Sequence, residues 1–319
     1  MKSYSLWIDK KKQAKIINKE FIYKKNSNTV LVKTIFSGIS KGTEKLVSTK
    51  LIKKNQFKLM RAPFQDGSFN LPIKYGYINV GKIINGPKKL INRNIFSLFP
   101  HQTLFEIPIK NINLLPNKNI KKYILIANME TAINIFWDSQ SNKNDKILIF
   151  GLGSVGLLTA YFFKLQNYKK VYVYDTNYYK KKYAKLLGLK FINIKQAKDF
   201  NVIINTTSNY KILEKSMSLL EDEGKIVEAS WYGSKKGFLS LGDYFHSKRL
   251  KLISSQVSQI PKHMKNKYDY KKRLKLAINS LEDKKLEKLI TSESNFFNLE
   301  RDYFKILNNK NVVMHLIKY

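Results

Sequence analysis

The sequence predicts a two-domain α/β protein, in which a β-barrel precedes a doubly wound parallel sheet. Short runs of β-forming residues, separated by glycine and proline, fill the chain to about Pro116. From Lys146 onward strand and helix patterns alternate, which is typical of a parallel sheet with helices on both faces. A last β run, Val312–Ile317, follows helical segments, and we expect it to rejoin the barrel.

The first domain is expected to comprise residues 1–117 and 258–319. Its strands are predicted at Thr29–Phe36, Tyr77–Ile84, Asn94–Leu98 and Thr103–Ile107. From Lys121 the periodicity changes, and apolar residues three and four positions apart predict a buried helix over Ile124–Trp137. After Pro261 a further helix is predicted over Lys271–Leu281.

The second domain is expected to comprise residues 118–257. Its strands are predicted at Lys146–Phe150, Val171–Tyr174, Phe191–Asn193, Val202–Asn205, Lys225–Ala229 and Lys251–Val257. Its helices are predicted at Val155–Gln166, Tyr178–Leu187 and Tyr210–Leu220, the second of them ended by Gly188.

Composition excludes several classes of protein. The 319 residues include no cysteine, which rules out disulfides, thiolate catalysis and any zinc site with a sulfur ligand. The N-terminal residues lack the apolar core of a signal peptide, and we expect a cytoplasmic protein. The longest uncharged run, Ile147–Phe163, has 17 residues and contains three glycines, so we expect no membrane span.

The chain is strongly basic, with a formal net charge of +36. Of its 59 basic residues only five are arginines, the side chain that makes forked contacts to phosphates and guanine. The lysines are spread along the chain together with many asparagines, isoleucines and tyrosines, as in the product of an AT-rich coding sequence. We therefore expect no specific nucleic-acid partner, and a basic nucleic-acid-associated module is the alternative.

A glycine-rich turn joins the first predicted strand of the second domain to its helix. Lys146-Ile-Leu-Ile-Phe-Gly-Leu-Gly-Ser-Val-Gly has the GxGxxG spacing of dinucleotide-binding Rossmann folds. Gly151 would permit the tight turn, Gly153 the close approach of a pyrophosphate, and Gly156 the packing of helix on strand. Asp175 ends the next strand, where it would bind the adenosine ribose and disfavour a 2′-phosphate. This predicts NAD rather than NADP, although Lys180, Lys181 and Lys182 weaken the preference.

The predicted chain passes from a barrel to a Rossmann domain and then returns to the barrel. This order resembles that of the medium-chain dehydrogenase/reductase superfamily, and the resemblance covers nearly the whole chain. Three segments carry it: Ser37-Gly-Ile-Ser-Lys-Gly-Thr-Glu44, Leu71–Gly81 and Glu130-Thr-Ala132. The first is most similar to a subgroup that includes the hydroxyethyl-bacteriochlorophyllide dehydrogenases. The resemblance implies a GroES-like barrel with a catalytic role, a Rossmann domain and a substrate cleft between them. It also implies a homodimer joined near Lys251–Val257.

The resemblance places the nicotinamide cofactor on a defined set of residues. The expected cofactor-binding residues are Thr131, Gly151, Gly153, Ser154, Val155, Gly156, Asp175, Thr206 and Ser230.

At the positions where the family has its catalytic zinc ligands, this chain has side chains of a different chemical type. Ser40 and Tyr77 stand at the first two positions, and only Glu130 near the third could bind metal. The four-cysteine structural zinc loop is missing. One carboxylate, a serine and a tyrosine do not make a zinc site, so we expect no zinc.

Without zinc, another group must polarise the carbonyl and supply the proton. Tyr77 is the first candidate, because the resemblance places it at a zinc-ligand position beside the nicotinamide. Ser40, Lys41, Glu44 and Glu130 would complete a proton relay, and His101 is an alternative donor. An ordinary barrel turn, shaped by its glycines, is the competing interpretation of residues 37–44.

These observations predict a zinc-independent oxidoreductase that transfers a hydride between NAD(H) and a secondary alcohol or ketone. The alternatives are a zinc-free quinone or enone reductase and a dinucleotide-binding protein without turnover.

Overall fold

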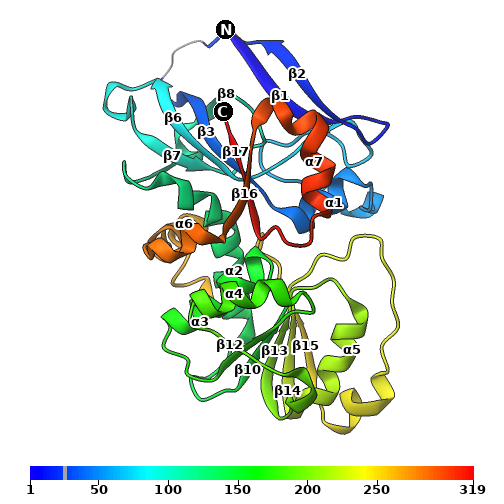
Figure 1. The fold of residues 1–319 in the computed structure, drawn as a ribbon. Helices are drawn as coiled ribbons and strands as arrows, with labels where there is room; N and C mark the ends of the chain where they lie inside the picture. The colour runs from blue at the N-terminus through cyan, green and yellow to red at the C-terminus, as the bar shows by residue number, and fades with distance from the viewer. Residues whose placement is uncertain (24–26) are drawn as a thin grey trace. The chain divides into compact units, whose positions relative to one another are not determined.

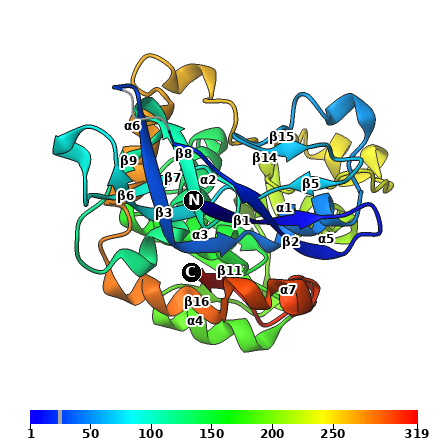
Figure 2. The same cartoon turned by 90° about the horizontal axis from the view of Figure 1, so that it is seen from above.

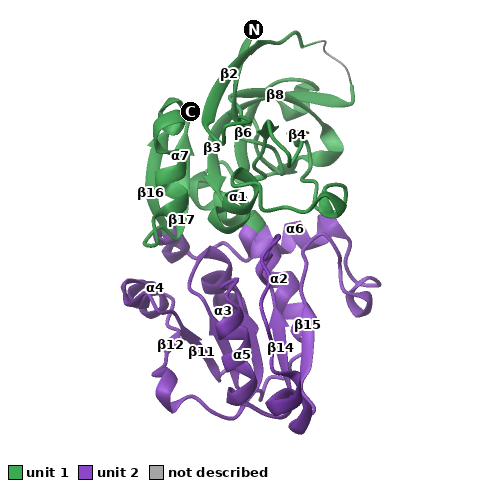
Figure 3. Ribbon diagram, turned by 90° about the vertical axis from the view of Figure 1, so that its right-hand side faces the viewer, with its two compact units in different colours: residues 1–127, 290–319 green, residues 128–289 purple. Residues whose placement is uncertain are grey.

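The computed structural model describes residues 1–23 and 27–319, which form two compact units (Figure 3). The barrel unit comprises residues 1–127 and 290–319, and the Rossmann unit residues 128–289. These units divide the chain at other residues than the expected domains, because residues 258–289 group with the Rossmann unit and residues 118–127 with the barrel unit. The reason lies in α6 (Tyr270–Asn279), whose Arg273 hydrogen-bonds to Glu130 and Asn134 of α2 (Ile126–Ser139).

The barrel unit contains two sheets (Figure 1). The smaller has the order β2-β1-β5-β4, and the larger has the order β16-β17-β3-β6-β7-β9 with β8 paired to β3. The strands are β1 (Lys2–Ile8), β2 (Ala14–Glu20), β3 (Thr29–Ile39), β4 (Asp66–Gly67), β5 (Ile73–Lys74), β6 (Asn79–Asn85), β7 (Asn94–Ser97), β8 (Leu104–Pro108), β9 (Asn113–Leu114), β16 (Ile290–Asn295) and β17 (Met314–Lys318).

The four strands predicted for the barrel are all present, and their buried faces form its core. Val30 and Val32 of β3 pack with Ile83 of β6, Ile95 of β7 and Phe105 of β8. The expected return of the chain is also confirmed. Strand β17 pairs antiparallel with the end of β3, so that the last residues complete the larger sheet.

Among the residues that the structure describes, two α-helices belong entirely to the barrel unit, α1 (Lys41–Ser48) and α7 (Leu299–Asn308). Helix α7 lies beside β2 (Figure 2), where Ile16 N–H donates to Glu300 Oε1 over 2.7 Å. Short 3₁₀ turns occur at Lys54–Gln56, Lys88–Leu90, Ile109–Asn111, Ile120–Leu125 and Phe296–Asn298. The predicted helix at Ile124 therefore begins as a 3₁₀ turn and becomes α-helical only at Ile126.

The Rossmann unit contains a six-stranded parallel sheet of order β12-β11-β10-β13-β14-β15, and the predicted alternation is confirmed. Its elements are β10 (Ile147–Phe150), α3 (Ser154–Leu165), β11 (Val171–Tyr174), α4 (Lys181–Leu186), β12 (Lys190–Phe191), β13 (Phe200–Asn205), α5 (Tyr210–Leu219), β14 (Leu220–Glu228) and β15 (Lys251–Ser254). Shorter helical turns occur at Tyr178–Lys180, Ile194–Gln196, Leu241–Phe245, Lys262–Met264 and Lys284–Leu289.

Several elements of the Rossmann unit begin or end at residues other than the predicted ones. The helix predicted from Tyr178 is a 3₁₀ turn followed by α4, and Gly188 after it has the left-handed φ of 64° that was expected. Strand β14 begins five residues earlier than predicted, because its first residue, Leu220, pairs with Phe200 at the start of β13. Strand β15 is at the sheet edge, and the homodimer through it stays a prediction. No helix among the described residues is long and apolar enough to cross a membrane.

Candidate functional site

The glycine-rich loop between β10 and α3 has a different local geometry at each of its three glycines. Gly151 has a φ of 94°, and a Cβ there would meet Thr206 Oγ1 at 2.7 Å. A Cβ on Gly156 would lie 1.9 Å from the Gly151 carbonyl oxygen, so helix and strand pack too closely for any side chain. A Cβ on Gly153 would meet nothing within 4 Å. Gly153 therefore leaves open space beside the loop, as the approach of a pyrophosphate requires.

Helix α3 begins at this open space. Gly153 is its N-cap and contributes no side-chain hydrogen bond, so no cap side chain satisfies the first N–H groups of the helix. Ser154 and Val155 lie in this first turn. Such a helix end attracts anions through its N–H groups and its dipole.

Asp175 follows β11 and lies against the glycine-rich loop. Its Oδ2 accepts the Leu152 N–H over 2.7 Å, and its Oδ1 accepts the Asn177 N–H over 2.7 Å. Lys180 Nζ lies 3.2 Å from Oδ2. The carboxylate is thus held at the loop, with one ammonium group beside it.

Thr206 follows β13 and Ser230 follows β14, and each side chain hydrogen-bonds to a neighbouring segment. Thr206 Oγ1 donates to the Phe150 carbonyl oxygen over 2.8 Å, immediately before the glycine-rich loop. Ser230 Oγ accepts the Ser208 N–H over 2.9 Å. The third predicted residue of this kind, Thr131, is half-buried on α2.

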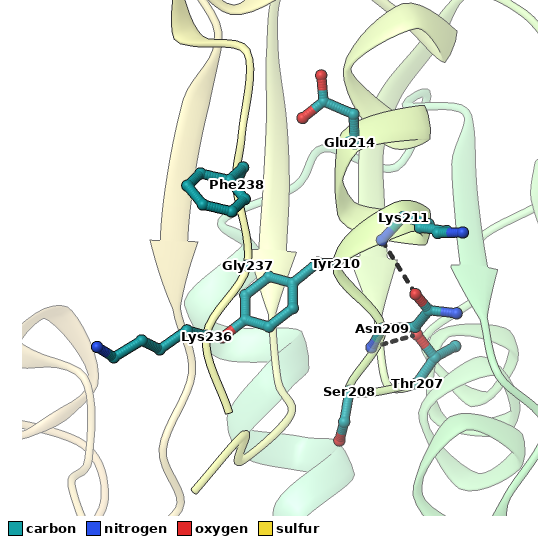
Figure 4. Close-up of a pocket in the computed structure, with 9 residues that line it drawn as sticks. All are labelled: Thr207, Ser208, Asn209, Tyr210, Lys211, Glu214, Lys236, Gly237 and Phe238. Atoms are coloured by element: carbon teal, nitrogen blue, oxygen red, sulfur yellow. Dashed lines mark hydrogen bonds between the residues drawn. The ribbon is translucent and has the colours of Figure 1, made fainter. Parts of the chain in front are cut away.

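An open pocket of about 740 Å³ borders this region (Figure 4). It is formed by the N-terminal turn of α5 and by the segment that precedes β15. Tyr210 of α5 presents its ring to Gly237, and its hydroxyl donates to the Lys235 carbonyl oxygen over 2.8 Å. The pocket includes neither Gly153 nor Asp175, so it adjoins the dinucleotide motif without containing it.

In the barrel unit a buried polar cluster surrounds Glu44 of α1. Glu44 Oε1 accepts the Ser40 N–H over 2.8 Å. Glu44 Oε2 lies 3.2 Å from His101 Nε2 and accepts the Tyr303 hydroxyl over 2.8 Å. Glu44 and His101 are 1% and 0% exposed, so protein groups alone must solvate this carboxylate.

The hydrogen bonds orient the His101 ring. A carboxylate only accepts, so His101 Nε2 carries the proton that faces Glu44. His101 Nδ1 lies 2.8 Å from Ser37 Oγ, and Ser37 Oγ lies 2.8 Å from the Tyr319 hydroxyl. Tyr319, Ser37 and His101 therefore form one hydrogen-bonded chain that ends at Glu44.

Tyr77 lies beside this cluster and remains half-buried. Burial of its hydroxyl raises the pKa of Tyr77 to about 12, and hydrogen bonds with Ser40 and Thr43 oppose the rise. The charge of Glu44 raises this pKa further. Tyr77 is thus a neutral phenol at physiological pH, able to donate a hydrogen bond.

Two of the predicted relay residues make other contacts. The Lys41 ammonium donates to the carbonyl oxygens of Asn309 and Val312, at the end of α7. Glu130 belongs to the Rossmann unit, where Arg273 Nε donates to its Oε1 over 3.1 Å. Burial raises the pKa of Glu130, and Arg273 opposes the rise.

Sequence reasoning did not include Thr43, Tyr303 and Tyr319 in the site. Tyr303 stands at helical spacing with Leu299 and Ile306, and this pattern alone predicts a core aromatic residue. Nothing in the pattern indicates that its hydroxyl contacts Glu44. Among the residues that the structure describes, no group of three or more histidine, aspartate or glutamate side chains could hold a metal ion.

A second buried histidine of the barrel unit lies at a separate pocket of about 240 Å³. His315 accepts or donates at both ring nitrogens, 2.8 Å from Ser292 Oγ and 2.9 Å from Ser294 Oγ. Burial, and to a smaller extent the electrostatic interaction with His101, lower the pKa of His315 to about 4. Nearby Glu44, Glu293 and Asp302 oppose this shift.

The free energy of unfolding should depend on pH through the protonation of His315. Its pKa is about 4 in the folded chain and about 6.5 when unfolded, so the unfolded chain binds the extra proton. The stabilisation is complete above pH ~6.5 and is lost as the pH falls toward 4, by about 3 kcal/mol in all. Urea unfolding of the wild type and His315→Gln should show a stability difference that shrinks over this window. Parallel curves would contradict the assignment.

Comparison with solved structures identifies the fold. Neither a family model nor a curated protein sequence matches the chain. An alcohol dehydrogenase of Escherichia coli (rspB), solved with NADH, matches with a TM-score of 0.78 at 18% identity over 100% of this chain and 99% of that one. L-idonate 5-dehydrogenase of Escherichia coli gives 0.79 at 12% identity, over 100% and 99%. The 2R,3R-butanediol dehydrogenase of Bacillus subtilis gives 0.74 at 14% identity, over 99% of each chain. The chain therefore shares the fold of these solved dehydrogenases, which combines a GroES-like barrel with a Rossmann unit.

Proposed function

We propose that this protein is a zinc-independent oxidoreductase that transfers a hydride between NAD(H) and a secondary alcohol or ketone. The observation that carries the proposal is the glycine-rich loop, where Gly153 leaves open space at the uncapped start of α3 and the Asp175 carboxylate accepts the Leu152 N–H of the same loop. The shared fold supports it. The narrower resemblance to hydroxyethyl-bacteriochlorophyllide dehydrogenases is part of this proposal.

The described residues fit a nicotinamide dinucleotide. Ser154 and Val155 would hold the pyrophosphate through their N–H groups, and Asp175 would accept hydrogen bonds from the ribose hydroxyls. When bound, the nicotinamide supplies or takes up the hydride. The protein positions the reactants and polarises the carbonyl.

Tyr77 is proposed as the group that polarises the carbonyl oxygen. An alkoxide is far more basic than a phenolate, so transfer of the Tyr77 proton to the developing alkoxide is favourable. In the reverse direction the phenolate must accept a proton, and a pKa of about 12 makes that form rare at neutral pH. We therefore expect alcohol oxidation to accelerate as the pH rises, and carbonyl reduction to proceed at neutral pH.

The cofactor preference has a direct test. Asp175 would repel a 2′-phosphate, so NADH should bind more tightly than NADPH. Asp175→Ser should narrow the gap, because Lys180 then loses its partner and is free to pair with the phosphate. Isothermal titration with both cofactors measures it, and Lys180→Met is the control that should weaken NADPH binding in the Asp175→Ser background. Equal wild-type affinities would refute the assignment.

The metal content has a separate test. With Ser40 and Tyr77 at ligand positions and no cysteine in the chain, purified protein should contain no stoichiometric zinc. Elemental analysis after dialysis against a chelator measures this. One zinc per chain that survives chelation would overturn the zinc-independent site.

The activity itself is tested by a screen with both cofactors. Suitable substrates are (2R,3R)-butanediol, L-idonate and their ketones, with a quinone and an enone added for the alternative reductase. Thermal shift with NADH first establishes cofactor binding. Binding without turnover on any substrate would favour a dinucleotide-binding protein, and quinone turnover alone would favour the reductase.

A further inference from the structure

The buried contact between Glu44 and His101 connects parts of the barrel unit that are far apart in sequence. Glu44 lies on α1, and His101 lies between β7 and β8. Tyr303 of α7 reaches the same carboxylate oxygen as His101. Buried charged pairs often stabilise a fold no better than apolar residues of the same size.

The His101 ring contacts the backbone that leads into Tyr77. Gly76 has a φ of 121°, and a Cβ built there would lie 2.9 Å from both Cδ2 and Nε2 of His101. The ring thus packs directly on Gly76, where no side chain would fit. The His101 N–H also donates to the Tyr75 carbonyl oxygen over 3.4 Å. His101 consequently supports the chain on the N-terminal side of Tyr77.

Glu44 supports the hydroxyl end of the same residue. Its Oε1 holds the Ser40 N–H at the start of α1, over 2.8 Å. The Ser40 and Thr43 side chains, from that first turn, hydrogen-bond to the Tyr77 phenol. A shift of the Glu44 carboxylate would therefore move the two groups that orient the hydroxyl.

We propose that Glu44 and His101 form a positioning pair for Tyr77, in which His101 fixes its backbone and Glu44 fixes the partners of its hydroxyl. The inference rests on the proposed role of Tyr77 for its catalytic consequence only. Ser37 completes the arrangement, because its hydroxyl lies at His101 Nδ1 while Nε2 faces Glu44, and the Tyr319 hydroxyl in turn contacts Ser37. Neither member of the pair needs to touch the substrate.

The first experiment observes Tyr77 without any substrate. Protein labelled with ¹³Cζ-tyrosine shows a Tyr77 resonance that Tyr77→Phe identifies by its absence. His101→Leu and Glu44→Gln should both shift or broaden this resonance. His101→Gln should largely restore it, because its amide can still donate to Glu44. The matched control is His315→Gln, which removes another buried histidine of the barrel unit and should leave the Tyr77 resonance unchanged.

The second experiment is a kinetic double-mutant cycle on the best carbonyl substrate of the screen. Misplacing a reacting group by about 1 Å costs about 10²-fold in rate. We expect His101→Leu to lower kcat by about 10- to 100-fold with little change in KM. In the Tyr77→Phe background the same substitution should have almost no effect, because the group that it positions is gone.

The outcomes separate this inference from the proposed function. An unchanged Tyr77 resonance in His101→Leu and Glu44→Gln overturns the positioning pair, as does an equal His101→Leu effect in both kinetic backgrounds. If Tyr77→Phe keeps full turnover while the resonance responds as expected, the donor role is wrong and the positioning pair stands. If His101→Leu does not fold, Glu44→Gln provides the same readout, because it keeps the shape of the side chain.

Discussion

Tyr77→Phe should lower turnover by a factor of about 10² to 10⁴, the usual cost of losing one positioned general acid. The substitution removes only the hydroxyl and keeps the ring, which packs edge-on against Tyr75 with a 6.1 Å centroid distance. Folding and NADH binding should therefore survive. Steady-state reduction of a verified ketone, with NADH affinity measured separately, gives both quantities.

Tyr75→Phe is the matched control for this prediction. It makes the same chemical change in a buried neighbour, whose pKa burial also raises well above its ordinary value. Turnover of Tyr75→Phe should stay close to that of the wild type. A Tyr77→Phe variant with full activity would show that Tyr77 only packs, and the donor would then be sought at His101, Lys41 or Glu130.

Arg273→Met should destabilise the protein by about 3 to 5 kcal/mol, because it leaves the Glu130 carboxylate buried without its counter-charge. The guanidinium is 2% exposed and makes three hydrogen bonds, to Glu130, Asn134 and the Val257 carbonyl oxygen. These contacts join α6 to α2 and to the segment after β15. Urea unfolding, monitored by circular dichroism, measures the loss.

Two further variants test the cause of that loss. Glu130→Leu combined with Arg273→Met removes both charges and should recover much of the stability. Arg301→Met breaks an exposed contact with Asp302 and should leave the free energy of unfolding nearly unchanged. If the double variant is no more stable than Arg273→Met, lost packing rather than an uncompensated charge accounts for the effect.

Most of the architecture is visible in local patterns. The β runs of the barrel, the alternation after Lys146 and the return at Val312 all appear in the structure, because burial of one or both faces imposes a period on the chain. Helix and strand ends are less well predicted. The start of β14 shows why: Leu220 joins the sheet through its pairing with Phe200 of β13, which no local pattern reveals.

The dinucleotide motif is equally local. The three glycines and Asp175 lie within one strand–turn–helix–strand segment, where Gly151 has a positive φ and Gly156 packs against the Gly151 carbonyl oxygen. A pattern of that kind can be read from residue types and spacing alone, since the physical constraint acts between near neighbours.

The barrel cluster is of the opposite kind. Glu44 meets His101 57 positions away and Tyr303 259 positions away, while Ser37 meets Tyr319 across 282 positions. Serine, histidine and tyrosine are common residues, and each alone has a structural explanation. Composition and spacing established a dinucleotide fold without cysteine ligands. Which hydroxyls and carboxylates share one buried space depends on sheet pairing, because only the closed barrel excludes the water that would otherwise solvate Glu44.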